Sequence, residues 1–282
     1  MHEINLIDPN LKNYYDTIEL SIQVSLSGFS FCIHSTEDSR LHGFRDYALP
    51  QVVLQEDLLN FTDDILHKDE LLRLPFKRIR VIYTGRKTTL VPDEFFKTEN
   101  LKSILEFNQP IDELDEIHYN PIVQCRSQLV FAIPTYFAGL IIDKFPKAQF
   151  FNQATPVLQY AISELENVDA YRAIVQLNKE FFDLIVVKES RLILYNTFLY
   201  VNATDLSYFI LYVCKQLKID PKLIQLHFTG EFCGEQKLIH EVALYLKAPE
   251  AITIPDYFHN DDLIQKLPFD RFSSLLYVSR CE

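Results

Sequence analysis

The chain has 282 residues, 48% of them hydrophobic, which is enough for two ordinary domains with buried cores and argues against a disordered chain. Its 39 acidic and 27 basic residues give a net charge of −12, which argues against binding to nucleic acid or to an anionic membrane. Five cysteines without a Cys-x-x-Cys pair support neither a disulfide framework nor a zinc cluster. The first residues do not resemble a signal peptide, and no apolar run approaches the roughly 20 residues of a membrane span. We therefore expect a soluble cytoplasmic protein without a membrane partner.

The first half of the chain alternates between short apolar runs and polar breaks, which predicts strands joined by turns. The break Ser25-Leu26-Ser27-Gly28 suits a hairpin turn, because serine and glycine favour tight turns. Leucines at helical spacing between residues 54 and 72 predict one long helix or two short ones. The predicted strands of this part are Leu20–Val24, Phe29–His34, Leu41–Leu49 and Arg78–Tyr83.

Further strands and helices are predicted around residues 85–133, before the chain reaches its second half. Thr88–Val91, Ile117–Val123 and Leu129–Ile133 read as strands, and helices are predicted to begin near Pro134 and Pro156. The polar stretch 164–171 has no periodic pattern, so it is the predicted boundary between the halves. We predict an N-terminal domain over 1–168 and a C-terminal domain over 169–282.

The second half repeats the same order of elements between Ala173 and Glu231. Two apolar runs flank the turn Asn178-Lys179-Glu180, and a third run follows from Leu192 to Val201. Leu206 to Leu217 then shows helical spacing, and Asn202 to Asp205 offers capping residues, of which Thr204 or Asp205 can satisfy a free N–H at the start of the helix. Tyr208, Leu211 and Tyr212 form a second apolar face, which predicts that this helix is covered on two sides. A strand over Leu223–Phe228 follows, and Thr229-Gly230-Glu231 leads away from it.

The order of three strands, a helix and a strand, repeated twice along the chain, resembles the plan of the actin-like ATPase (ribonuclease H-like) superfamily. Particular strings narrow the resemblance, and together they resemble a bacterial domain-of-unknown-function family that is assigned an actin-like ATPase fold. The resemblance covers nearly the whole chain. It implies an α/β protein of two domains, each a mixed sheet of βββαβ type flanked by helices, facing each other across a cleft. The strings are LSIQVSLSGFSFCI from Leu20, Leu90-Val91-Pro92 before Phe95-Phe96, Asn196-Thr197-Phe198, Asp205 with Tyr208-Phe209, Gly230 and Cys281-Glu282.

The superfamily also implies where a nucleotide would bind. Its ATP-binding members clamp phosphate with two hairpin turns, typically Asp-x-Gly in the first and a glycine-rich turn with aspartate in the second. In this chain a serine stands roughly where the first aspartate should be, the second turn has no glycine, and Thr229-Gly230-Glu231 keeps one glycine of a third loop. An ordinary hairpin turn, an exposed lysine and a strand exit are the commoner explanations of the same residues. The candidate cleft residues are Ser25, Ser27, Gly28, Asn178, Lys179, Thr229 and Gly230.

Other catalytic and metal-binding patterns are incomplete. Gly85-Arg86-Lys87 has arginine where a P-loop requires lysine, and Arg80 stands in place of the earlier glycine. His227, Cys233 and His240 do not have the spacing of a metal site, so no metal ligand is predicted.

We therefore predict a non-catalytic module that binds an unidentified protein partner and needs no cofactor. The alternative is a nucleotide-binding ATPase or kinase-like enzyme that uses ATP and Mg²⁺ through altered phosphate loops, and self-association is a third hypothesis. The pairs Phe95-Phe96, Phe150-Phe151 and Tyr257-Phe258 are candidates for an exposed partner patch, with core packing as the other explanation.

Overall fold

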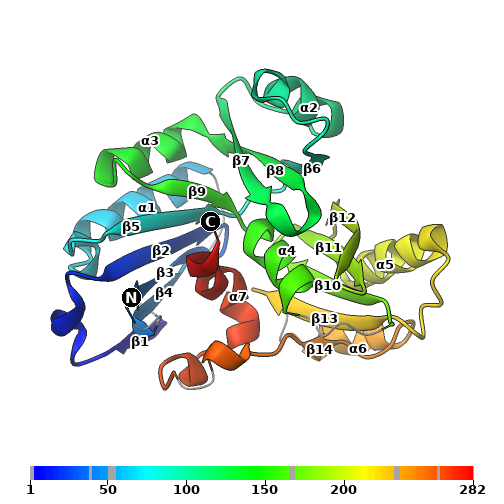
Figure 1. Ribbon diagram of the computed structural model, residues 1–282. Helices are drawn as coiled ribbons and strands as arrows, with labels where there is room; N and C mark the ends of the chain where they lie inside the picture. The colour runs from blue at the N-terminus through cyan, green and yellow to red at the C-terminus, as the bar shows by residue number, and fades with distance from the viewer. Residues whose placement is uncertain are drawn as a thin grey trace.

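A computed structural model shows three β-sheets and the helices that cover them, in the part of the chain that it describes (Figure 1). A six-stranded sheet forms from the first half of the sequence, a five-stranded sheet from the second half, and a three-stranded sheet from the inserted segment. The described residues are 3–37, 40–49, 55–164, 169–231, 236–258 and 261–281.

The six-stranded sheet has the order β1-β4-β3-β2-β5-β9. β2 is antiparallel to β3 and parallel to β5, because helix α1 (Gln55–Lys68) carries the chain from β4 back across the sheet. The prediction of three strands, a helix and a fourth strand is confirmed here. The strands are β1 (Ile4–Ile7), β2 (Ile18–Ser25), β3 (Gly28–Ser35), β4 (Leu41–Ala48), β5 (Arg78–Tyr83) and β9 (Gln149–Asn152).

The five-stranded sheet repeats this plan in the order β12-β11-β10-β13-β14. β10 is antiparallel to β11 and parallel to β13, with helix α5 (Ala203–Leu217) as the crossover from β12 to β13. The predicted architectural repeat is therefore confirmed, since β10 stands in this sheet as β2 stands in the first. The strands are β10 (Arg172–Leu177), β11 (Phe181–Lys188), β12 (Arg191–Leu199), β13 (Gln225–Gly230) and β14 (Glu250–Ala251).

The inserted segment forms an antiparallel sheet of order β6-β8-β7. Its strands are β6 (Thr88–Pro92), β7 (Asp115–Ile122) and β8 (Ser127–Pro134), and helix α2 (Leu101–Asn108) packs on one face. The strand predictions in this region are confirmed. The Asn120 side chain joins the insert to the first sheet, because its Nδ2 donates to Phe150 O at 2.9 Å and its Oδ1 accepts from Asn152 N at 3.1 Å.

Two helices lie between the large sheets, α4 (Ala154–Ser163) and α7 (Phe269–Tyr277), and their apolar side chains share one core with residues of both sheets (Figure 1). The rings of Phe44 on β4 and Phe272 on α7 lie 4.8 Å apart, centroid to centroid. The outer faces of the sheets are covered by α1 with α3 (Thr135–Lys144), and by α5 with α6 (Gln236–Ala243). The last helix of the chain thus packs on the first sheet as well as on the second.

Two details of α5 differ from the prediction. The cap is Asn202, whose Oδ1 accepts from the backbone N–H of Thr204 at 2.9 Å and of Asp205 at 3.1 Å, whereas Asp205 instead accepts from Val201 N. The second apolar face is not covered within the described part of the chain, because Tyr208 is 61% and Tyr212 47% exposed. No helix in the described ranges is long and apolar enough to cross a membrane. Of the predicted domain boundary, residues 165–168 lie outside the described residues.

We expect Asn202→Ala to lower the free energy of unfolding by about 1 kcal/mol, because two N–H groups of the first turn of α5 lose their acceptor. Urea unfolding followed by circular dichroism measures this change. Thr204→Ala is the matched control, since Thr204 is exposed and contributes only its backbone to the cap. Equal losses in the two variants would contradict the assignment of the cap.

Candidate functional site

The face of the first sheet that looks toward α7 carries a row of polar side chains. Leu20, Ile22 and Val24 of β2 belong to the core on the α1 side, so the alternation of the strand places Gln23 and Ser25 on the opposite face. The strand register puts Gln23 opposite Ser30 of β3, and Ser30 opposite Asp46 of β4. A polar row across three strands therefore meets α7.

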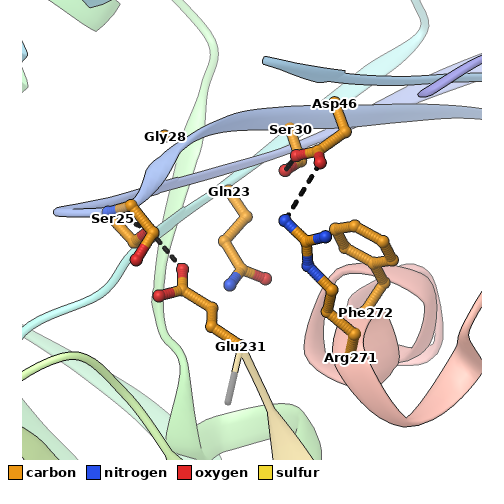
Figure 2. A pocket seen from close by; sticks show the side chains of 9 residues that line it. Gln23, Ser25, Gly28, Ser30, Asp46, Glu231, Arg271 and Phe272 are labelled. Atoms are coloured by element: carbon orange, nitrogen blue, oxygen red, sulfur yellow. Dashed lines mark hydrogen bonds and ion pairs between the residues drawn. The ribbon is translucent and has the colours of Figure 1, made fainter. Parts of the chain in front are cut away.

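A small polar cavity lies between this row and α7 (Figure 2). Its volume is about 10 Å³, which is close to the least that a single water molecule needs. A phosphate group does not fit into this space. The lining residues are Gln23, Ser25, Ser27, Gly28, Ser30, Asp46, Glu231, Arg271 and Phe272.

The carboxylate of Glu231 closes the first hairpin turn. Ser25 Oγ donates a hydrogen bond to Glu231 Oε1, and the Ser27 N–H donates to Ser25 Oγ at 3.1 Å. Glu231 as a residue is partly exposed, but its Oε2 is buried, and burial raises the pKa of the carboxyl against the opposing effect of the Ser25 and Ser27 hydroxyls. The anionic group at this turn is thus a side chain of the protein itself.

Two glycines allow close backbone contacts around this turn. Gly230 has φ +93°, and a Cβ there would lie 2.4 Å from Leu177 O, so only glycine lets β13 end against β10 and direct Glu231 toward the turn. A Cβ on Gly28 would lie 2.1 Å from Tyr47 O, so this position requires glycine for packing against β4.

An ion pair at the other end of the cavity fixes α7 to the first sheet. Arg271 Nη2 donates to Asp46 Oδ2 at 3.1 Å, and Ser30 Oγ donates to Asp46 Oδ1 at 2.6 Å (Figure 2). Burial raises the pKa of Asp46, while the hydrogen bond from Ser30 and the charge of Arg271 oppose the rise. A buried carboxylate with these partners holds the start of α7 over β4.

A second buried junction lies at the start of α4. Asp183 of β11 accepts hydrogen bonds from Gln153 Nε2 at 2.8 Å, Thr197 Oγ1 at 2.6 Å and the Tyr195 hydroxyl at 3.2 Å. Gln153 Oε1 in turn accepts from Gly85 N at 3.0 Å, which joins β11 to the loop after β5. Burial raises the pKa of Asp183 to about 6, although all three hydrogen bonds favour the ionised form.

The remaining candidate residues take no part in the cavity. Asn178 is buried, and its carbonyl accepts from the Tyr200 hydroxyl at 2.8 Å. Lys179 is exposed and lines a separate hollow of about 300 Å³ beside the start of α5. Thr229 Oγ1 donates to Asp270 O at 2.6 Å, so this hydroxyl holds α7. The structure therefore brings together Ser25, Ser27 and Gly28 with the exit of β13, but not with the second hairpin turn.

Sequence reasoning did not select the side chains that complete these junctions. Glu231 was visible only as the residue after a strand-ending glycine, and Asp183 only as an acid inside an apolar run. Nothing near Arg271 marked it. Among the described residues, no three His, Cys, Asp or Glu side chains are grouped as metal ligands would be, and Cys233 lies outside those residues.

Comparison with solved structures defines the class of this protein. A crystal structure from Bacteroides thetaiotaomicron, described as a protein with an actin-like ATPase fold and unknown function, superposes with a TM-score of 0.80 at 21% identity. The match covers 98% of this chain and 100% of that one. The PilM–PilN type IV pilus biogenesis complex matches with a TM-score of 0.60 at 10% identity, covering 93% of this chain and 98% of that one. The fold is that of the actin-like ATPases.

The family follows from the sequence. Residues 10–248 match the model of DUF3822, a family described as proteins of unknown function, and the chain belongs to this family. A search of curated protein sequences found no significant match. The resemblance predicted from the sequence, to a family of unknown function with an actin-like ATPase fold, is confirmed.

We expect Asp183→Asn to flatten the pH dependence of stability between about pH 4 and pH 6. The pKa of Asp183 is about 6 in the folded protein and near the ordinary 3.8 in the unfolded chain, so in this window the folded state binds a proton that the unfolded state lacks. The contribution of this group to stability is therefore present at low pH and is lost as the pH rises, by an amount on the order of 3 kcal/mol.

Urea unfolding of the wild type and the variant across this pH range measures the difference. The asparagine can keep the junction, because the Thr197 and Tyr195 hydroxyls can accept as well as donate hydrogen bonds. Asp143→Asn, at an exposed site, controls for the change in net charge. Parallel curves for the wild type and Asp183→Asn would show that Asp183 does not titrate in this window.

Proposed function

We propose that this chain is a non-catalytic protein-interaction module on an actin-like ATPase scaffold. The observation that carries the proposal is the position of Glu231, whose carboxylate takes the hydrogen bond from Ser25 that an anionic ligand of the first turn would need. The cavity that remains, about 10 Å³, is far smaller than a nucleotide phosphate with its Mg²⁺. The second turn supports the same proposal, since Asn178-Lys179-Glu180 provides no glycine for close approach of a phosphate.

Exposed apolar side chains support the interaction role. On α5, the neighbouring rings of Tyr208 and Tyr212 stack with their centroids 6.4 Å apart and are 61% and 47% exposed, and adjacent apolar groups left in water are a feature of partner surfaces. Of the aromatic pairs singled out in the sequence, Phe95 is exposed, whereas Phe151 and Phe258 are buried in the core. The side chain of Tyr257 lies outside the described residues.

The comparison with the PilM–PilN complex adds support from a related fold. That structure is a complex of two proteins, and the matched chain is of similar length to this one.

The alternative function, a nucleotide-binding ATPase or kinase-like enzyme, requires Glu231 to leave the first turn. Withdrawal would break the hydrogen bond from Ser25 and expose a carboxylate that now lies beside Arg271 and Asp46. Binding of Mg-ATP would have to compensate for that rearrangement.

We expect the melting temperature of the wild-type protein to be unchanged by millimolar Mg-ATP, and no phosphate to be released above the buffer rate. A ligand of the folded state at 100 times its dissociation constant would stabilise the protein by about 2.7 kcal/mol, which corresponds to a rise of several degrees. Differential scanning fluorimetry and a phosphate-release assay measure the two quantities.

Ser27→Leu is the control variant, because Ser27 lines the cavity at the turn and leucine would block a phosphate there; circular dichroism checks that the variant folds. Gly28 is unsuitable for this purpose, since any side chain there would collide with Tyr47 O. A rise in melting temperature with Mg-ATP that disappears in Ser27→Leu would overturn the proposal in favour of the nucleotide-binding alternative.

A further inference from the structure

Besides the Ser27 hydroxyl, three buried polar atoms around the cavity lack a hydrogen-bond partner among the described residues. They are Gln23 Oε1, Glu231 Oε2 and Arg271 Nε. Each comes from a different part of the chain, β2, the exit of β13 and α7, and all three residues line the same cavity. A buried polar atom without a partner costs about 1–3 kcal/mol, so three at one place require a common explanation.

The arrangement of these groups is that of a small polar binding site. Gln23 is 9% exposed, and its amide lies between the Glu231 carboxylate and the Arg271 guanidinium (Figure 2). Two of the three atoms are acceptors and one, the Nε–H of Arg271, is a donor. The volume of about 10 Å³ admits a group no larger than one water molecule.

We propose that this cavity is a binding site for one ordered water molecule. The water accepts a hydrogen bond from Arg271 Nε and donates its two hydrogens to Gln23 Oε1 and Glu231 Oε2. This gives the three hydrogen bonds that buried waters usually make. The Ser27 hydroxyl also lines the cavity and offers a fourth contact.

The chemistry of the site selects water over ions. A cation would face the positively charged guanidinium of Arg271, which also pairs with Asp46. An anion would face the carboxylate of Glu231, whose second oxygen is held by Ser25. Only a neutral group that both donates and accepts satisfies the three atoms together.

The water gives Gln23 and Arg271 a positioning role toward Glu231. Neither side chain has a direct hydrogen bond to the Glu231 carboxylate among the described contacts. The water connects both side chains to Glu231 Oε2. The closure of the first hairpin turn is then shared by both halves of the protein. This inference does not depend on the proposed function, because the water site is compatible with any role of the closed cleft.

A high-resolution crystal structure of the wild-type protein tests the site directly. We expect a single peak of water density within hydrogen-bond distance of Gln23 Oε1, Glu231 Oε2 and Arg271 Nε. An empty cavity, a direct contact of Gln23 with both partners, or a peak with the coordination of a metal ion would each overturn the proposal.

A double-mutant cycle tests the coupling through the water. Gln23→Leu removes an acceptor and fills the cavity, and Arg271→Met removes the donor while keeping an unbranched side chain. Gln23 and Arg271 have no direct hydrogen bond to each other. Without the water, the falls in melting temperature of the two single variants should therefore add in the double variant. With the water, either single variant disrupts the same site, and the loss in the double variant is smaller than the sum.

Ser21→Ala, on the same face of β2, is the matched control for the cycle, since Ser21 does not line the cavity. The fall in melting temperature caused by Ser21→Ala should add to the fall caused by Arg271→Met. Strict additivity of Gln23→Leu with Arg271→Met would overturn the bridging role even if all the variants fold normally.

Discussion

The hydrogen bond between Ser25 and Glu231 is the contact that joins the first hairpin turn to the second half of the protein. It joins residues 206 positions apart and closes the turn between β2 and β3 with the end of β13. A carboxylate removed from water must find hydrogen-bond donors or lose its charge, so Glu231 is held where the serine hydroxyls lie. The region that would be a binding cleft in an actin-like enzyme is therefore an interface within the chain.

Two further features support that interface. The helices α4 and α7 bury apolar side chains from both sheets in one core, so opening the cleft would expose hydrophobic surface. Two polar junctions, Arg271 with Asp46 and Gln153 with Asp183, lie at separate points of the same interface. Separation of the halves would break both contacts, although Asp46 would keep its hydrogen bond from Ser30, and Asp183 those from Thr197 and Tyr195. The fold family by itself does not decide the function, because function lies in the particular sites that a fold carries.

The sequence was informative wherever structure follows from a local period. Alternation in Leu20–Val24 and helical spacing in Leu206–Leu217 predicted the strand and the helix, because one face of each must be buried. The repeated order of elements then predicted the topology. The sequence placed the cap of α5 within Asn202–Asp205 but favoured Thr204 or Asp205 over Asn202, since asparagine, threonine and aspartate are all good caps and only the backbone geometry chooses among them.

The sequence by itself determined the two βββαβ units. It also determined that their turns lack phosphate-binding residues, since a serine stands in place of an aspartate and Asn178-Lys179-Glu180 contains no glycine. Only the tertiary structure decided what fills the first turn. Glu231, Arg271 and Asp183 carry no local signal, because their partners lie far away in the sequence and are brought close by the packing of α4 and α7 between the sheets. Periodicity records which side of an element is buried, whereas a contact between two distant polar side chains exists only once both elements have been placed.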